Sequence, residues 1–405
     1  MQLLADTVKK MYRNDVKNLA LPPAKVELGG KKDFEASPNL GALLSRYKIT
    51  LAVTLEYEHA LALIDGKHGR VRAQYLELPH PSGIFFDREN LIVSSTRSPN
   101  QIIYFRIFPK RYQPETLNNI LPNLRSENSK GQKARLDSIL LLPAKSVFLP
   151  GQFSIHDVAK IQSDLYVTAT GVNFLARVHP EGGFERIWHP KCLDRLGRRA
   201  FTTNYLQLNS IAKGKTVKDS FFTAFSDQPT QTKPWKLGYG PKGKGVVFEG
   251  SSRETIYRGL TCPHSIRKKN GKLWLCDSGM GELGTLDPAQ GRYTPAAKLQ
   301  GFTRGLAFLG PYAIVGLSKV IPQYEPYAPG LDARKSQCGI IFVNLKTGES
   351  EASLLWKEGF QIYDVQTLDG IDNVLLPQNS DEEGMNYYLT YYGWDRRWKK
   401  TKERK

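Results

Sequence analysis

The sequence predicts an all-β fold and, within that class, a six-bladed β-propeller. Three observations lead to this prediction. A short phrase recurs six times, consisting of a polar residue, a small or acidic residue and an aliphatic residue, each time followed by a turn and a second strand-like run. The copies lie roughly 40 to 75 residues apart, a spacing typical of repeats arranged around an axis. Strand-like runs closed by Gly and Pro fill most of the chain after residue 46.

The six copies of the phrase define the six units of the repeat. They are Ser82-Gly83-Ile84, His156-Asp157-Val158, Asn209-Ser210-Ile211, His264-Ser265-Ile266, Arg304-Gly305-Leu306 and Tyr363-Asp364-Val365. One four-stranded unit cannot bury both of its faces alone, so the units have to stack to build a shared core. A β-sandwich with long loops is the alternative fold.

The segments before the first copy indicate how the ring closes. Residues 1–45 are expected to hold one short helix, over residues 3–19, and a linker, because a proline pair follows the helical pattern. The strand-like runs 49–64 and 70–78 have no partner of their own, while the last copy supplies only two strands. We therefore expect these N-terminal strands to pair with the C-terminal blade, which removes two exposed sheet edges.

The chain divides into three regions on this basis. Residues 1–45 form the N-terminal helix and linker, residues 46–380 form the propeller, and residues 381–405 form a basic, aromatic C-terminal tail. Residues 110–145 interrupt the strand pattern with an Asn-rich and Lys-rich stretch. We expect this insertion to be a long surface excursion.

The net charge of +18 is the most distinctive feature of the composition. A basic protein attracts nucleic acid, anionic lipid or acidic proteins. Much of the excess charge lies in clusters at the two ends of the chain, and no recognition helix, zinc finger or stacking platform accompanies it. Specific nucleic-acid binding is therefore not expected, whereas the basic tails are candidates for contact with an acidic protein or a membrane surface.

The sequence predicts a cytoplasmic protein. No apolar run reaches the about 18 residues that a spanning helix requires, and the N-terminus lacks the apolar stretch of a secretory signal. The four cysteines are widely spaced without a CxxC pair, which favours small core residues over disulfides.

The first residue of each phrase is the best candidate for a site. In a propeller the first strand of each blade runs beside the central channel, and its side chains alternate across the strand. The polar column should therefore ring one mouth of the axis, and it comprises Ser82, His156, Asn209, His264, Arg304 and Tyr363. The aliphatic column should pack in the blades. Asp157 and Asp364 fall in the column between, and we expect them to point away from the axis and either to cap turns or to bond neighbouring blades.

The residue types in this ring suggest several functions. Arg304 suits a carboxylate or phosphate, so the leading hypothesis is a protein that binds a small anionic or peptide-like ligand at the channel mouth. His156 and His264 are candidate ligands of a divalent metal, or an acid and base, which would make the protein a hydrolase-like or lactonase-like enzyme. A third hypothesis is an interaction scaffold acting through the basic tails. The ring could also serve only to satisfy the strand ends with hydrogen bonds.

Several blocks resemble a bacterial family of conserved hypothetical proteins, catalogued as a domain of unknown function. The blocks are PHS at 263–265, DSGxGELG at 277–284, FxRGLAF at 302–308 and GLSK at 316–319. The resemblance covers roughly residues 45 to 378 and suits a propeller, but the family brings no established activity. The insertion 110–145, Cys262 before the PHS block and the basic tails depart from the family pattern. Six-bladed lactonase and strictosidine-synthase-like propellers are similar in architecture, but their acidic metal-binding pattern is not evident here.

Overall fold

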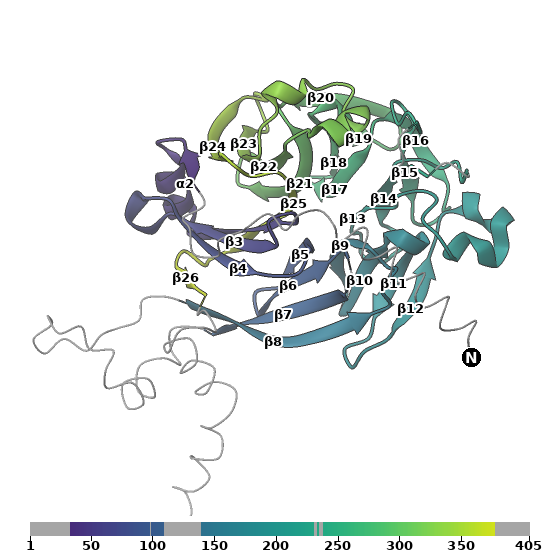
Figure 1. Cartoon of the computed structure of the whole chain (residues 1–405), viewed down its shortest axis with the longest axis horizontal. Helices are drawn as coiled ribbons and strands as arrows, with labels where there is room; N and C mark the ends of the chain where they lie inside the picture. The colour runs from purple at the N-terminus through teal and green to yellow at the C-terminus, as the bar shows by residue number, and fades with distance from the viewer. Residues whose placement is uncertain (1–32, 98, 109–138, 231–232, 235–237, 377–405) are drawn as a thin grey trace, which may run out of the picture. The chain divides into compact units, whose positions relative to one another are not determined.

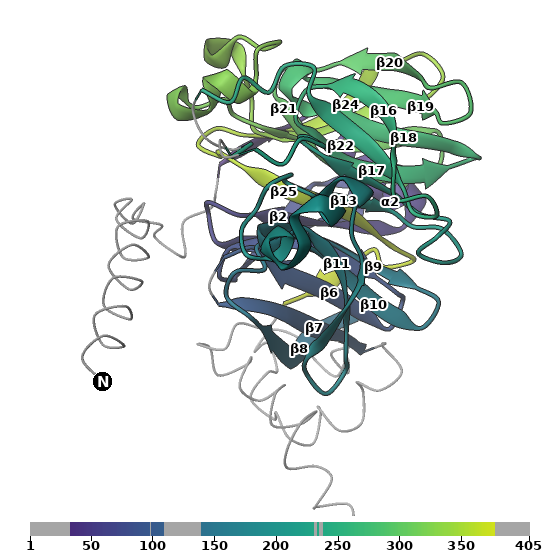
Figure 2. The same cartoon turned by 90° about the vertical axis from the view of Figure 1, so that its right-hand side faces the viewer.

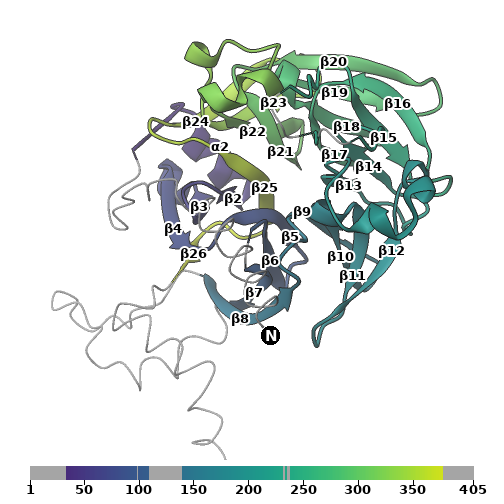
Figure 3. The ribbon, with the colours of Figure 1, turned by 45° about the vertical axis from the view of Figure 1, so that its right-hand side comes forward.

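Six antiparallel sheets surround a common axis in the computed structural model of the chain (Figure 1). The structure describes residues 33–376 apart from 98, 109–138, 231–232 and 235–237. This arrangement confirms the predicted six-bladed propeller. In each sheet one strand lies nearest the axis, and the others follow outward (Figure 3).

The blades are numbered here in chain order, with strands given from the axis outward. Blade 1 contains β25 (Ile362–Asp369), β2 (Ile49–Leu55), β3 (Ala60–Asp65) and β4 (Arg72–Glu77). Blade 2 contains β5 (Pro81–Phe86), β6 (Asn90–Ser95), β7 (Asn100–Phe108), β8 (Ile139–Leu149) and β26 (Val374–Leu375). Blade 3 contains β9 (Ile155–Ile161), β10 (Asp164–Ala169), β11 (Phe174–Val178) and β12 (Phe184–Trp188).

The second half of the ring repeats the pattern. Blade 4 contains β13 (Ser210–Ala212), β14 (Phe221–Ala224), β15 (Gly245–Glu249) and β16 (Thr255–Leu260). Blade 5 contains β17 (Pro263–Lys269), β18 (Lys272–Asp277), β19 (Glu282–Asp287) and β20 (Arg292–Lys298). Blade 6 contains β21 (Phe302–Leu309), β22 (Tyr312–Ser318), β23 (Gly339–Asn344), β24 (Ser350–Trp356) and, at its outer edge, β1 (Phe34–Ala36).

Helices in the described part of the chain are short. The α-helix α2 (Leu40–Tyr47) precedes β2 and lies at the periphery of the ring in Figure 1, while Figure 2 shows the ring of sheets from the side. The 3-10 helices lie in the connections between strands: η1 (Lys67–Gly69), η4 (Thr170–Val172), η5 (Lys191–Phe201), η6 (Ser278–Met280), η7 (Pro322–Tyr327) and η8 (Ala333–Lys335). None of them has the length and apolar character that crossing a membrane would require.

The ring closes in blade 1, where the C-terminal strand β25 pairs antiparallel with β2. This confirms that N-terminal strands join a C-terminal one. The division differs from the expectation of two and two: three strands come from the N-terminal side, because the run 49–64 turns at residues 56–59 and forms both β2 and β3. The second C-terminal strand, β26, instead pairs parallel with β8 at the edge of blade 2.

The regions that flank the propeller differ in how far they are described. The predicted helix at 3–19 and the tail 381–405 lie outside the described residues. The segment 1–45 was expected to be a helix and a linker, and its described part contains β1 and the start of α2. The insertion 110–145 was expected to be a surface excursion, but its end from residue 139 onward belongs to β8.

Hydrophobic clusters of buried residues form the core, and the repeated phrase contributes one residue to each of six of them. The third residue of each phrase lies in a different cluster: Val365, Val158, Ile211, Ile84, Leu306 and Ile266. The predicted aliphatic column is therefore a set of core anchors, one for each blade. The four cysteines are free thiols, and three of them are buried, in line with the role expected for them.

Candidate functional site

The six phrases occupy equivalent places on the innermost strands, one in each blade. A cavity of about 680 Å³ lies where these strands begin, on one face of the ring. Four of the six predicted residues line it, namely His156, His264, Arg304 and Tyr363. The structure therefore gathers most of the polar column around one pocket.

Ser82 and Asn209 do not line this pocket. The Ser82 hydroxyl is fully buried and contacts the Ser94 hydroxyl at 2.9 Å. The Asn209 amide donates to the Pro263 carbonyl at 2.9 Å and accepts from the Thr223 hydroxyl at 2.7 Å. These two members of the column hold strands together, which is the structural role that was considered for the whole ring.

Arg304 is the central cation of the pocket. Its guanidinium lies over the ring of Tyr363, 3.3 Å from the centroid, and its residue is only 7% exposed. In the orientation that satisfies both neighbours, the amide of Gln361 accepts from Arg304 Nη1 at 2.9 Å and donates to Glu56 Oε2 at 2.7 Å. Tyr363 also takes a side-chain hydrogen bond from the Arg304 guanidinium. The guanidinium donors that remain after Gln361 and Tyr363 have no hydrogen bond to a described residue, and they border the cavity. They are available to a ligand.

Glu56 anchors this network from the β2–β3 turn. Its Oε1 lies 2.9 Å from Arg97 Nε and 3.0 Å from His80 Nδ1. Burial would raise the pKa of the carboxyl, but the His80 hydrogen bond and the charges of Arg97, His80 and Arg304 outweigh it and lower the pKa. The group is therefore a buried carboxylate that orients Gln361 and neutralises one of the two arginines.

Three residues that line the cavity were not predicted from the sequence, namely Glu56, Arg97 and Gln361. They lie outside the repeated phrase, with Glu56 in the β2–β3 turn, Arg97 in the β6–β7 connection and Gln361 directly before β25. One signal was present: the turn at residues 56–59 places ionisable side chains between two strands that are fully buried. The ionisable side chains of a turn bounded by such strands need hydrogen-bonding partners in the folded protein.

His156 is held on both sides of its ring. Nδ1 lies 2.8 Å from the Ser154 carbonyl, which can only accept, so Nδ1 carries the proton. Nε2 accepts from the Gln207 amide at 3.0 Å. Burial, followed by the charge of Arg304, lowers the pKa of His156 to about 3. The ring is therefore neutral, and neither nitrogen is free to bind a metal.

His264 differs because one nitrogen is free. Nδ1 lies 2.9 Å from the Cys262 carbonyl and 3.0 Å from the Ser278 hydroxyl, and that hydroxyl donates its own proton to the Thr303 carbonyl at 2.6 Å. Nδ1 is thus the protonated nitrogen, and Nε2 has an unshared pair with no partner among the described residues. Burial, then the charges of Arg304 and His156, lower the pKa of His264 well below its ordinary value.

The donor set does not favour a metal centre. Within the described residues, no group of three or more His, Cys, Asp or Glu side chains is placed to hold an ion. Of the two histidines that were candidate ligands, His156 has both nitrogens occupied and His264 offers one. The arrangement is better suited to recognising a ligand through hydrogen bonds and charge.

The pocket carries a net positive charge within the described residues that line it. Arg97, Arg304 and Lys319 supply three cations, and Glu56 is the single carboxylate among the lining residues. Lys319 is tethered, since its Nζ donates to the Lys357 carbonyl at 2.9 Å. A cavity with excess positive charge attracts anions.

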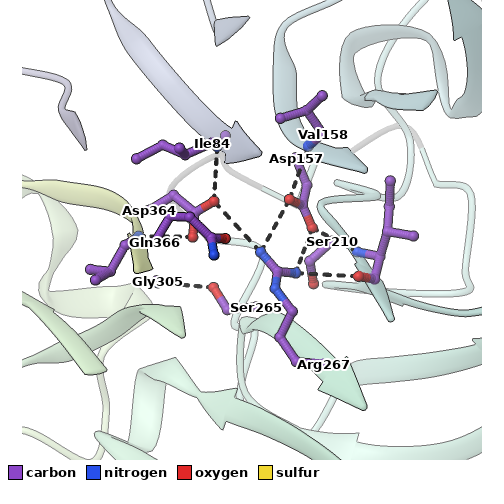
Figure 4. Close-up of polar contacts among 12 residues, drawn as sticks. Ile84, Asp157, Val158, Ser210, Ser265, Arg267, Gly305, Asp364 and Gln366 are labelled. Atoms are coloured by element: carbon purple, nitrogen blue, oxygen red, sulfur yellow. Dashed lines mark hydrogen bonds and ion pairs between the residues drawn. The ribbon is translucent and has the colours of Figure 1, made fainter. Parts of the chain in front are cut away.

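A second polar layer lies at the level of the middle residues of the phrases, and Figure 4 shows it. Arg267 of β17 binds Asp157 of β9 through Nη1–Oδ2 at 2.7 Å and Nη2–Oδ1 at 3.2 Å. Its Nη2 also lies 3.6 Å from Asp364 Oδ2 of β25. These residues belong to blades 5, 3 and 1, which are not neighbours, so their side chains meet across the axis.

This layer corrects the expectation that Asp157 and Asp364 point away from the axis. Strict alternation fails because the inner strands are irregular at the phrase, with register shifts at His156–Asp157, at Tyr363 and at Ser265–Ile266. A bulge lets successive side chains face the same side of a strand. The expected bonding to neighbouring blades is present as well. Asp157 accepts from the backbone of Ile211 at 2.8 Å, and Asp364 accepts from that of Ile84 at 3.0 Å.

The same joint, a contact between the middle residue of a phrase and the next blade, recurs around the ring. Ser210 accepts from the Ile266 amide at 3.1 Å, and Ser265 accepts from the Gly305 amide at 2.9 Å. The two glycine copies pack directly instead: a Cβ on Gly83 would lie 2.8 Å from Asp157 Cα, and one on Gly305 would lie 2.9 Å from the Val365 nitrogen. The middle residue of every phrase therefore touches the next blade.

The fold and the pocket together define a class: a six-bladed β-propeller with a cationic pocket at one end of its axis. The chain belongs to the family described as "Domain of unknown function (DUF4915)", whose model matches residues 38–376. This agrees with the resemblance found in the sequence blocks at the level of a family of unknown function.

Comparison with other known proteins adds fold information only. No curated protein matches the chain. A chain in the crystal structure of a nidogen/laminin complex is similar, with a TM-score of 0.51, 11% identity, and coverage of 80% of this chain and 99% of that one. Virginiamycin B lyase from Staphylococcus aureus is also similar, with a TM-score of 0.37, 14% identity, and coverage of 65% and 71%. The first likeness supports the fold, and no argument rests on the second.

Proposed function

We propose that this protein binds a small anionic or peptide-like ligand in the pocket at the mouth of the propeller axis. The observation that carries the proposal is Arg304. Its guanidinium is buried, stacked on Tyr363 and fixed by the Gln361–Glu56 pair, yet it keeps donors that no described residue uses. A planar, pre-oriented guanidinium beside a cavity matches a carboxylate or phosphate through two parallel hydrogen bonds.

The other cations in the cavity favour an anionic ligand over a neutral one. Arg97 shares its charge with Glu56, so it contributes less than Arg304 to the field in the cavity. Lys319 approaches from the loop after β22. Both histidines are neutral, so they act as hydrogen-bonding groups and add no positive charge.

The test is titration calorimetry with acetate, citrate and inorganic phosphate on the full chain, compared across three proteins. The native protein should bind at least one of these anions, Arg304→Ala should lose at least about tenfold in affinity, and Arg304→Lys should keep part of it. Arg334→Ala is the matched control, because that side chain is 91% exposed and its ion pair within the described residues is with Asp332. Absence of binding by the native protein, or equal loss in the control, would refute the proposal.

Two expectations from the sequence belong to the same proposal. We place the protein in the cytoplasm, which its four free thiols support, and cell fractionation tests this. We also assign to the basic tails a contact with an acidic protein or a membrane surface. Deleting residues 381–405 should weaken sedimentation with anionic vesicles or retention of an acidic protein, and it should leave anion binding in the pocket unchanged.

A further inference from the structure

The pocket has a second, aromatic end that the anion does not explain. The ring of His264 lies between Phe225 and Phe302, edge-on to both, with centroid distances of 5.2 Å and 5.5 Å. Tyr327, from the loop between β22 and β23, packs on Phe225 and Phe302 in the same cluster. All four residues line the cavity that Arg304 also borders. The cavity thus joins a cationic end and an aromatic end.

Two polar atoms at the aromatic end have no partner among the described residues. Nε2 of His264 is an acceptor only, because the proton sits on Nδ1, where the Cys262 carbonyl holds it. The hydroxyl of Tyr327 is buried, in a residue that is 8% exposed, and it makes no hydrogen bond to a described residue. A buried hydroxyl left unpaired costs free energy that a ligand could recover.

These two atoms specify what the far end of the ligand should carry. A flat apolar group would fill the space between the phenylalanines, where edge-to-face contacts favour an aromatic ring over an aliphatic chain. A hydroxyl on that ring would donate to Nε2 of His264, and its oxygen could accept from a donor such as the Tyr327 hydroxyl. An aliphatic acid would leave both protein atoms unpaired.

We propose that the ligand of this pocket is a hydroxyaryl carboxylate, whose carboxylate binds Arg304 and whose ring hydroxyl donates to Nε2 of His264 between Phe225 and Phe302. The inference rests on the proposed function, since it assigns Arg304 to the carboxylate. It goes further by fixing the chemistry at the aromatic part of the pocket.

The experiment compares small probes by calorimetry on the full chain. The first set is 4-hydroxyphenylacetate, 3-(4-hydroxyphenyl)propanoate and 4-(4-hydroxyphenyl)butanoate, which together scan the distance between the two ends. The second set is the same three acids without the hydroxyl, and the third is acetate, propanoate and butanoate. At the best chain length, we expect the ring to improve affinity over the simple acid at least about tenfold, and the hydroxyl to add about tenfold more.

Two variants connect the preference to the named atoms. Tyr327→Phe removes only the unpaired hydroxyl, so it should fold at least as stably as the native protein and reduce the preference for the hydroxylated acid several-fold. His264→Phe should abolish that preference, whereas Arg334→Ala, which lies outside the pocket, should leave both the preference and the affinity for acetate unchanged. If His264→Phe does not fold, Tyr327→Phe alone decides.

The outcomes separate this inference from the proposed function. If the simple acids bind through Arg304 but the aryl acids bind no more tightly, the hydroxyaryl assignment is wrong and the anion site stands. If the aryl acids bind more tightly but without a preference for the hydroxyl, the assignment of the His264 acceptor is wrong. If no acid binds, both proposals fail.

Discussion

Arg267 reaches across the propeller axis from β17 to Asp157 on β9, with its Nη1 2.7 Å from Oδ2 and its Nη2 3.2 Å from Oδ1. The same guanidinium faces Asp364 at 3.6 Å. A single cation therefore ties together three alternate blades, while each of the two carboxylates also bonds the backbone of the blade beside it. This group lies directly behind the pocket, so the position of the inner strands depends on it.

Replacing Arg267 with methionine should destabilise the ring strongly. The change leaves two buried carboxylates without a cation, a loss of about 3–5 kcal/mol in the free energy of unfolding for a broken buried pair. Urea unfolding followed by tryptophan fluorescence measures it. Arg177→Met is the control, because the Arg177 side chain is 35% exposed and its pairs with Asp164 and Glu185 are at the surface. Such pairs contribute about 0–1 kcal/mol, and equal losses in the two variants would contradict the axial role.

The stability of the protein should depend on pH through Asp277. Burial raises the pKa of this carboxyl from its ordinary 3.8 to about 7, with Glu282 adding to the rise, while the Thr261 amide and Lys298 oppose it. The native state therefore holds a proton that the unfolded chain releases, so this contribution is complete below about pH 4 and is lost as the pH rises towards 7. Asp277→Asn should flatten the profile over that window, by up to about 4 kcal/mol. An unchanged slope in urea unfolding across that range would count against it.

His156 should stay neutral in weakly acidic solution. Burial and the nearby Arg304 lower its pKa to about 3, and its proton sits on Nδ1 against the Ser154 carbonyl. Nitrogen NMR of ¹⁵N-histidine-labelled protein should show a neutral Nδ1-protonated ring from pH 8 down to pH 5. Resonances of a doubly protonated ring at pH 6 would contradict this. Because the unfolded chain takes up a proton near its ordinary pKa of 6.5, the residue should lower stability as the pH falls below that value.

Gly305 should be far less tolerant than a glycine in an exposed turn. Its φ is +84°, and a Cβ there would lie 2.9 Å from the Val365 nitrogen of the next blade. Gly291 has a φ of +58° with no atom within 4 Å of a Cβ. Alanine at either position meets the cost of a left-handed conformation, about 1–2 kcal/mol, and Gly305→Ala should cost about 1–3 kcal/mol more. Equal melting temperatures for the two variants would show that the blades separate freely at this joint.

The repeated phrase is the feature of the sequence that predicted most of the fold. Its third residue is an anchor of each blade core and its period counts the blades, so Ile84 and its equivalents were enough to predict the ring. The number of strands that each end gives to blade 1 was not visible, because the β2–β3 turn interrupts what looks like one apolar run. The pairing of strand β26 was not predicted either, because two residues that pair in parallel with β8 leave no periodic signal in the sequence.

The pocket was predictable only in part. Alternation placed His156, His264, Arg304 and Tyr363 at the mouth. It placed Ser82 and Asn209 there too, but Ser82 contacts Ser94 and Asn209 bonds Pro263 instead. Bulges at the phrase turned Asp157 and Asp364 towards the axis, and no rule of period two anticipates a bulge.

No pattern in the sequence predicts the partners that orient Arg304. Glu56 and Gln361 come from connections at opposite ends of the propeller sequence, and they meet because blade 1 is built from both. No short-range signal links two residues so far apart in the chain. Their pairing becomes visible only when the ring is closed.

The order in which the strands of blade 1 are synthesised also decides when the pocket can form. Strands β2, β3 and β4 are synthesised before their innermost partner, β25. Until β25 is made, the edge of β2 has no neighbour on the axial side, and Glu56 lacks Gln361. The binding pocket is therefore incomplete until residue 361 has been made, and a chain truncated before it should lack β25, β26 and the anion site.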